Sequence, residues 1–163
     1  MSKDFKVVRV GAEAAASLAS VHAQGFSDAW PAATFEALLV RPYVLALAVL
    51  VNPEASLRGF ILIQVIADEA EVLTFCVEPE FRGHKLGAAL LEAAAEVARE
   101  MGVTQIFLEV NEANAVARGL YAKQEFVVVG RRSAYYRDPA QASPGTDALV
   151  MRKTLRTGPA SAN

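Results

Sequence analysis

The segment that most constrains this chain is a strand, loop, helix and strand series near its middle. An apolar run at 71–77 stops before Pro79, and a loop containing two glycines follows at 82–87. From 86 to 101 apolar residues recur at three- and four-residue steps, which is the pattern of a helix with one buried face. Residues 104–110 then alternate between apolar and polar, as a strand does. This order predicts two parallel strands joined by a right-handed helical crossover.

The flanking segments extend this unit into an α/β (α+β) fold. The pattern predicts strands at 5–10, 43–51, 57–66, 126–129 and 148–153, and helices at 12–24, 34–39 and 114–123. A polar turn joins the second and third of these strands, which favours an antiparallel hairpin, and a long polar loop is expected after residue 129. Strands in runs together with a crossover unit indicate a mixed sheet with helices on its faces.

Composition narrows the class of protein. With 163 residues, 53% of them hydrophobic, we expect one domain over 1–156 and a disordered tail at 157–163. The 16 basic and 18 acidic residues give a net charge of −2, so neither nucleic acid nor a membrane surface is an expected partner. The lone Cys76 excludes an internal disulfide and a multi-cysteine zinc site, and we expect no metal and a cytoplasmic location.

The loop at 82–87 has the composition of an anion site. The first amides of a helix lack intrahelical partners and carry partial positive charge. Gly83 and Gly87 reduce steric bulk there, and Arg82, His84 and Lys85 add cationic or polar side chains. Taken alone, these residues suit an ordinary loop and helix cap equally well.

Residues 77–91, Val-Glu-Pro-Glu-Phe-Arg-Gly-His-Lys-Leu-Gly-Ala-Ala-Leu-Leu, resemble the acyl-CoA signature of the GNAT N-acetyltransferases, (Gln or Arg)-x-x-Gly-x-(Gly or Ala). Arg82 and Gly87 match its ends, and Lys85 stands where the first glycine is usual. The resemblance implies the GNAT fold, with about six to seven strands in a mostly antiparallel sheet and about four helices. It also implies that loop amides hold the acetyl-CoA pyrophosphate and that the preceding strand end pairs with the pantetheine arm. The cofactor-binding residues implied are Phe75, Cys76, Val77, Arg82, Gly83, His84, Lys85, Leu86, Gly87 and Ala88.

Residues 108–126 resemble the ribosomal-protein-alanine N-acetyltransferase branch of that family, in which a Leu-Glu-Val strand end precedes an Asn and a Leu-Tyr on the next helix. The resemblance implies that Glu109 is the general base, that Tyr121 is the general acid or donor to the CoA sulfur, and that Asn114 binds CoA. Asn114 and Tyr121 are seven residues apart, close to two helical turns, so both could face the cofactor. Transfer would be direct in a ternary complex, which leaves Cys76 no nucleophilic role.

Two further segments resemble the acceptor side of the same family. Trp30 lies in a segment similar to the loop between the first two helices, and Tyr135 and Tyr136 resemble its Tyr-Tyr loop. The three residues are therefore expected to bind substrate. At pH 7, neutralising a terminal α-amine costs roughly 1 kcal/mol and a lysine roughly 4.6 kcal/mol, which makes a protein N-terminus the easier acceptor.

Several alternatives remain open. Before the resemblance is considered, a glutamate at a strand end is an ordinary solvated carboxylate, a tyrosine on a helix is a core residue, and two loop tyrosines are surface residues. The sequence also allows acetylation of a small amine or a lysine side chain, and a catalytically silent acyl-CoA-binding module. Either a monomer or a homodimer is compatible with it.

Overall fold

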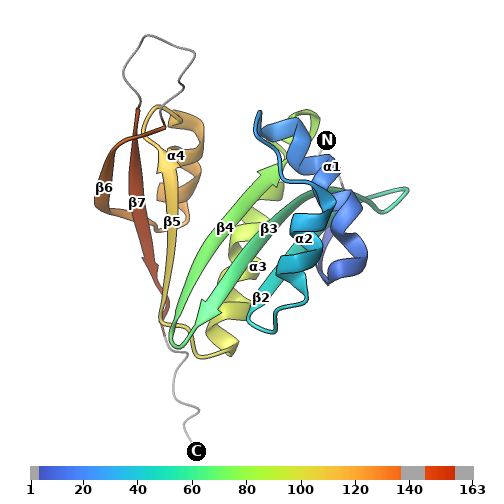
Figure 1. Ribbon diagram of the computed structural model, residues 1–163, viewed down its shortest axis with the longest axis horizontal. Coiled ribbons are helices and arrows are strands. Elements are labelled where there is room, and N and C mark those ends of the chain that lie inside the picture. Colours follow the sequence, from blue (N-terminus) through green and yellow to red (C-terminus); the bar gives the residue numbers. More distant parts are fainter. Residues whose placement is uncertain (1–3, 137–145, 157–163) are drawn as a thin grey trace, which may run out of the picture.

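The computed structural model describes residues 4–136 and 146–156, with the side chains of 134–136 left out, and forms one seven-stranded sheet in the order β1-β2-β3-β4-β5-β7-β6 (Figure 1). The strands are β1 (Phe5–Val10), β2 (Val44–Val51), β3 (Ser56–Ile66), β4 (Glu69–Val77), β5 (Gln105–Asn111), β6 (Val127–Tyr136) and β7 (Thr146–Thr154). The α-helices are α1 (Ala15–Gly25), α2 (Ala32–Leu39), α3 (Leu86–Glu100) and α4 (Ala115–Lys123), and short 3₁₀ turns cover Ala12–Ala14 and Pro79–Phe81. This confirms the predicted mixed, mostly antiparallel sheet.

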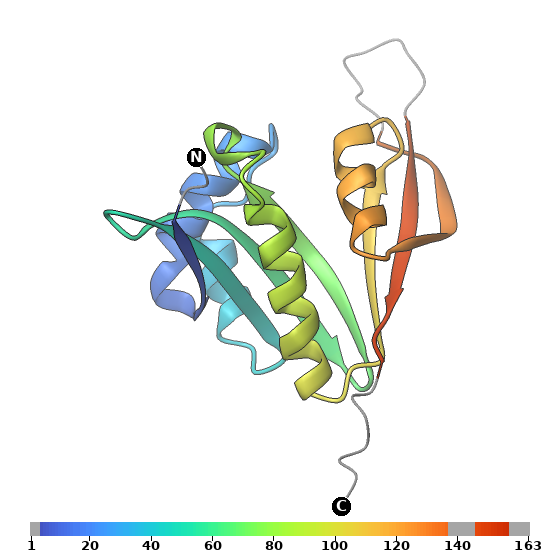
Figure 2. The same ribbon diagram turned by 180° about the vertical axis from the view of Figure 1, so that it is seen from behind.

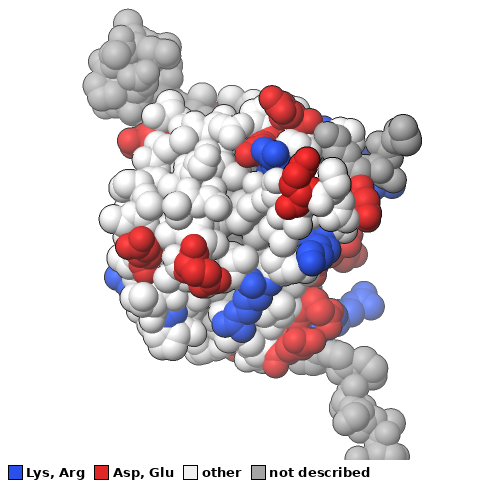
Figure 3. All heavy atoms as spheres, turned by 90° about the vertical axis from the view of Figure 1, so that its right-hand side faces the viewer, with Lys and Arg blue, Asp and Glu red and all other residues white. Residues whose placement is uncertain are grey.

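Helices cover both faces of the sheet. Helices α1 and α2 lie on one face (Figure 1), and α3 lies on the other, as the view from behind shows (Figure 2). The core is therefore divided into two layers, one around Leu18 and Phe35 and one around Ile61 and Leu90. On the side of the molecule where α1 lies, acidic and basic side chains are interspersed with neutral ones (Figure 3). Among the described residues, no helix is long and apolar enough to cross a membrane.

Helix α3 begins and ends close to the predicted positions. Its C-terminus is closed by Gly102, whose φ of +87° suits glycine. The Gly102 amide donates to the Arg99 carbonyl and the Val103 amide donates to the Ala98 carbonyl, both at 3.0 Å. These two bonds form a Schellman motif that ends the helix and directs the chain into β5.

The prediction of a long polar loop after residue 129 was wrong for residues 130–136, and the rest of that loop, 137–145, lies outside the described residues. Strand β6 continues to Tyr136 and pairs antiparallel with β7, with register shifts around Val129 and after Arg132. It is the last strand of the sheet, so one backbone edge and much of its surface face solvent. An edge strand of this kind needs few apolar residues, and periodicity therefore fails to detect it. The predicted tail at 157–163 lies outside the described residues.

The feature that positions the site is the divergence of β4 and β5. These parallel strands pair only where residues Glu69 to Glu71 face Gln105 to Phe107, and no further pairing between them occurs in the described part of the chain. Strand β4 has a bulge in its register with β3, where Leu62 faces Thr74 but Ile63 faces Val72. Because a bulge bends and twists its strand, it turns the end of β4 away from β5. The sheet opens into a V at the carboxyl ends of both strands (Figure 1).

Candidate active site

The turn before α3 offers backbone amides to an anion. Gly83 and Lys85 have φ of +82° and +67°, and these left-handed residues direct the chain into the helix. The first intrahelical bond runs from the Ala89 amide to the Lys85 carbonyl at 3.1 Å, so the amides of Leu86, Gly87 and Ala88 precede the ladder. No described side chain caps them. The predicted loop therefore has the donors that a pyrophosphate requires.

Lys85 stands where the family signature has glycine. The backbone there is left-handed, a conformation that glycine adopts without strain. Lysine adopts the same conformation at some energetic cost and retains the amide. Arg82, Gly83 and Lys85 are exposed and His84 is half-buried, so these side chains lie at the surface of the turn.

The end of β4 forms one arm of the V. In the described part of the chain, no strand pairs with its edge toward β5 over the predicted residues Phe75, Cys76 and Val77. An added extended chain can pair with such an edge. The Arg82 Nε donates to the Val77 carbonyl at 3.1 Å and fixes the turn against the strand end. Burial raises the pKa of Cys76 to about 11, despite the nearby Arg82 charge, so the thiol is protonated and a poor nucleophile.

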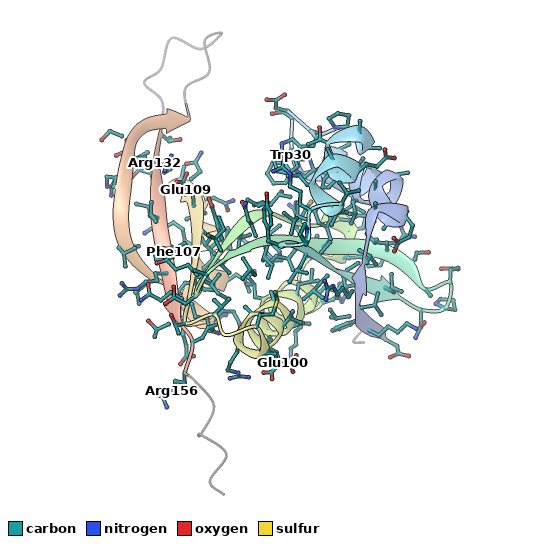
Figure 4. The ribbon with its side chains drawn as sticks, turned by 60° about the horizontal axis from the view of Figure 1, so that its bottom comes forward. Trp30, Glu100, Phe107, Glu109, Arg132 and Arg156 are labelled. Carbon is teal, nitrogen blue, oxygen red and sulfur yellow. The ribbon has the colours of Figure 1, made fainter. Side chains whose placement is uncertain are left out.

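The other arm carries Glu109 on β5. Burial alternates along this strand, with Ile106, Leu108 and Val110 buried, so Glu109 faces the opposite side of the sheet. Its Oε1 forms an ion pair with the Nε of Arg132 from β6 at 3.0 Å, and its side chain is 24% exposed. Figure 4 shows Glu109 and Arg132 together on one arm, with Trp30 on the opposite side of the opening.

Tyr121 lies on the helical side of the opening. It is 7% exposed, and its ring lies 6.2 Å from Phe75 of β4 and 5.9 Å from Phe126 between centroids. The neighbouring Leu120 approaches the start of α3, where a Cβ added to Gly87 would lie 3.2 Å from it. Residues of β4, α3 and α4 thus meet around Tyr121. The same position also fits a tyrosine that serves only as a core residue.

Asn114 lies immediately before α4 and caps it. Its Oδ1 accepts a hydrogen bond from the Ala117 amide at 3.1 Å, and its own backbone is not helical. Asn114 therefore lies one residue before the helix that carries Tyr121. The seven-residue spacing does not place the two side chains on one helical face. The cap explains the local requirement for asparagine without a cofactor.

A groove lies beside Trp30 and α2, on the side where the acceptor is expected. This groove, of about 520 Å³, is lined by Trp30, Ala33, Thr34, Ala37, Leu38, Arg41, Gln64 and Leu73. A second cavity, of about 280 Å³, lies near the vertex of the V and is lined by Gln64, Ile66, Glu69, Ala70, Glu71 and Phe107. Tyr135 and Tyr136 lie at the end of β6, and their side chains lie outside the described part of the structure.

Sequence reasoning missed two residues near these groups. No sequence motif marks Arg132 as a partner of Glu109, because their contact joins β6 to β5 across the intervening strand β7. His22 lies in no motif either. It is buried, and it contacts both the backbone of Trp30 and the side chain of Thr74 on β4.

Comparison with known proteins assigns this fold and loop to a class. The family model of the Acetyltransferase (GNAT) family matches residues 15–126. The chain belongs to this family and is an acetyl-CoA-dependent N-acetyltransferase. This confirms the resemblance of the loop to the acyl-CoA signature.

The similar proteins include alanine N-acetyltransferases of ribosomal proteins and an acetyltransferase of a polyamine. A Bacillus subtilis protein with the provisional name ribosomal protein bS18-alanine N-acetyltransferase is 32% identical over 136 residues, 83% of this chain and 85% of its own length. The crystal structure of the Escherichia coli ribosomal-protein-S18-alanine N-acetyltransferase superposes with a TM-score of 0.84 at 22% identity, over 98% of this chain and 99% of that one. A Thermoplasma acidophilum spermidine N(1)-acetyltransferase is 33% identical over 75 residues, 46% of this chain and 47% of its own.

Proposed function

We propose that this enzyme transfers the acetyl group of acetyl-CoA to the N-terminal α-amine of an alanine-starting protein, and that this protein is ribosomal protein bS18. The observation that carries the proposal is the match to the Bacillus subtilis protein, which extends over most of both chains. The placement of Glu109 and Trp30 on opposite arms supports it, because an extended peptide end could enter between them (Figure 4).

In the proposed reaction Glu109 accepts a proton from the acceptor amine, directly or through one water. The neutral nitrogen then attacks the thioester carbonyl, the new C–N bond forms, and the C–S bond breaks. The leaving thiolate takes a proton from the Tyr121 hydroxyl, and the surplus proton of the attacking nitrogen returns to the Tyr121 oxygen. This gives CoA and the acetylated amine, and Glu109 releases its proton to solvent. The ion pair with Arg132 orients the Glu109 carboxylate for the first step. The loop at 82–87 would hold the pyrophosphate, and the free edge of β4 would hold the pantetheine arm.

A small polyamine is the second candidate acceptor. The spermidine acetyltransferase among the relatives favours it, and so do the carboxylates of Glu69 and Glu71 at the second cavity. Phe107 lines this cavity and lies on the same face of β5 as Glu109, two residues away. A cation held between these carboxylates would therefore lie near the proposed base.

The decisive experiment measures CoA release with three acceptors. They are a peptide that begins with the N-terminal residues of bS18, the same peptide with a blocked N-terminus and an internal lysine, and spermidine. We expect kcat/KM for the free N-terminus to exceed both others by at least about tenfold. Higher kcat/KM with spermidine would favour the polyamine enzyme, and no release with any acceptor would favour an acyl-CoA-binding module.

The same assay tests the base. Glu109→Gln should lower kcat at pH 7 by about 10²- to 10⁴-fold, the usual contribution of a general base, with little change in acetyl-CoA affinity. Glu112→Gln is the matched control, because Glu112 lies three residues further on and pairs with Arg131 as Glu109 pairs with Arg132. Equal kcat in Glu109→Gln and Glu112→Gln would remove Glu109 from the mechanism.

A further inference from the structure

A buried histidine connects the two sides of the site. His22 lies in the last turn of α1 and is 2% exposed. Its Nδ1 accepts a hydrogen bond from the backbone amide of Trp30 at 3.0 Å, and its Nε2 lies 3.1 Å from the Thr74 hydroxyl. Trp30 lines the acceptor groove, and Thr74 precedes the segment of β4 proposed to hold the pantetheine arm.

Only one neutral tautomer satisfies both contacts. A backbone amide is always a donor, so Nδ1 must present a lone pair to Trp30. Nε2 therefore carries the proton and donates it to the Thr74 oxygen. A protonated ring would have a second N–H at Nδ1, directed at the Trp30 amide. Burial lowers the pKa of His22, which keeps the ring in the accepting form at neutral pH.

The surroundings of the ring are aromatic rather than charged. Phe26 stacks on it at 4.3 Å between centroids, and the rings of Trp30, Phe35 and Phe60 lie 5.2, 5.6 and 6.2 Å away. The packed elements also carry titratable and charged groups, and among the described residues none of these groups forms a hydrogen bond or an ion pair with the ring. They are Cys76 of β4, Glu78 directly after that strand, Arg58 of β3, Glu36 of α2 and Asp28 of the connecting loop, of which Glu78 pairs with Arg58.

We infer that His22 is a positioning residue for the acceptor: its fixed tautomer couples the Trp30 wall of the groove to Thr74 on the cofactor strand. This inference rests on the proposed function and adds a residue to it. Packing alone would require an apolar side chain of similar size, whereas here each ring nitrogen meets one polar partner with the matching role. A change at Thr74 should therefore reach Trp30 through the ring.

The test uses Thr74→Val, which removes the hydroxyl and preserves the shape of the side chain. Without its acceptor, Nε2–H is buried and unpaired, and the ring that accepts from Trp30 loses one of its two fixed contacts and can shift, although the Trp30 amide still selects the same tautomer. Thr74→Ser retains the hydroxyl and is the matched control. His22→Leu removes both contacts directly. Melting temperature and circular dichroism establish that each variant is folded.

Trp30 is the only tryptophan in the chain, so its fluorescence reports on this contact without any assay of activity. We expect the emission of Thr74→Val and His22→Leu to differ from that of the wild type at pH 7.5, and that of Thr74→Ser to match it. In the wild type the emission should be constant above pH 6.5 and change as the pH falls below that ordinary histidine value. His22→Leu should lack this acid transition.

Kinetics give the second readout. We expect the KM for the peptide acceptor to rise about 3- to 10-fold in Thr74→Val, the loss expected for one hydrogen bond, with the KM for acetyl-CoA within about twofold. Wild-type emission and wild-type peptide KM in folded Thr74→Val would overturn the inference. The emission of Thr74→Val could also change while the wild-type chain acetylates no peptide. In that case the proposed function fails, and with it the role of His22 in positioning the acceptor. The structural link between Trp30 and Thr74 would still stand.

Discussion

At the scale of single residues, Lys85 shows how the signature loop tolerates a side chain. Its φ of +67° lies in the left-handed region, which costs a residue with a Cβ about 1 kcal/mol or more. Lys85→Gly and Lys85→Ala remove the same ammonium group, but only glycine relieves the backbone. We expect Lys85→Gly to have a free energy of unfolding about 1 kcal/mol higher than that of Lys85→Ala in urea denaturation.

The same pair of variants separates backbone from charge in cofactor binding. Both should raise the KM for acetyl-CoA by a similar factor, because both lose the cationic side chain beside the first amides of α3. Equal unfolding free energies for the two variants would show that the left-handed conformation costs nothing here. A normal KM in both would show that the ammonium makes no contribution to acetyl-CoA binding.

Single residues also show which parts of the candidate site a sequence motif can identify. Lys85 and Glu109 were found because a motif places each of them at a fixed distance from a strand end or a helix start. Arg132 and His22 have no such local signal. The partner of Arg132 lies 23 positions earlier in the chain, and that of His22 lies on β4, so only the folded sheet brings these groups together.

At the scale of elements, α1 packs against β4 through a glycine. A Cβ added to Gly25 would lie 2.6 Å from the Sγ of the buried Cys76, closer than van der Waals contact allows. The backbone there has no positive φ, so a clash and not strain is the expected effect. We expect Gly25→Ala to lower the free energy of unfolding by about 1–3 kcal/mol in the wild type and by less than about 1 kcal/mol in a Cys76→Ala background.

Gly119 provides the control for this double-mutant cycle. It lies in α4, and a Cβ added there would meet nothing within 4 Å. Gly119→Ala should therefore stabilise the protein by about 0.5–1 kcal/mol, the ordinary gain in a helix. Additive effects of Gly25→Ala and Cys76→Ala would mean that the sulfur is not what the new methyl group meets.

Element boundaries show where periodicity stops being informative. Helix α3 was predicted almost to the residue because one face of it is buried along its whole length and Gly102 ends it. Strand β6 was predicted too short, because its pairing with β7 and not apolar alternation defines it. Asn114 was placed inside α4, whereas its side chain caps the helix from outside.

At the scale of the whole molecule, the candidate site is the space between two parts of one sheet. The sequence predicts that β4 and β5 are parallel, but not that they separate after three residue pairs. The separation follows from the bulge opposite Leu62 and Ile63 and from the packing of α1 and α4 at the two arms, which are nonlocal effects. Beyond the vertex, a ligand that pairs with the edge of β4 and reaches the turn before α3 would occupy the space between the two arms.

Acetyl-CoA should therefore stabilise the molecule and protect a defined set of amides. At 100 times its Kd it adds about 2.7 kcal/mol to the free energy of unfolding, which for a chain of this size raises Tm by about 5–10 °C. Amide hydrogen exchange should slow in the turn at 82–88 and on the edge of β4 from 72 to 77. ADP, which carries a pyrophosphate but no pantetheine arm, should slow exchange in the turn alone. If acetyl-CoA protected the turn and left β4 unchanged, the strand would not hold the pantetheine arm.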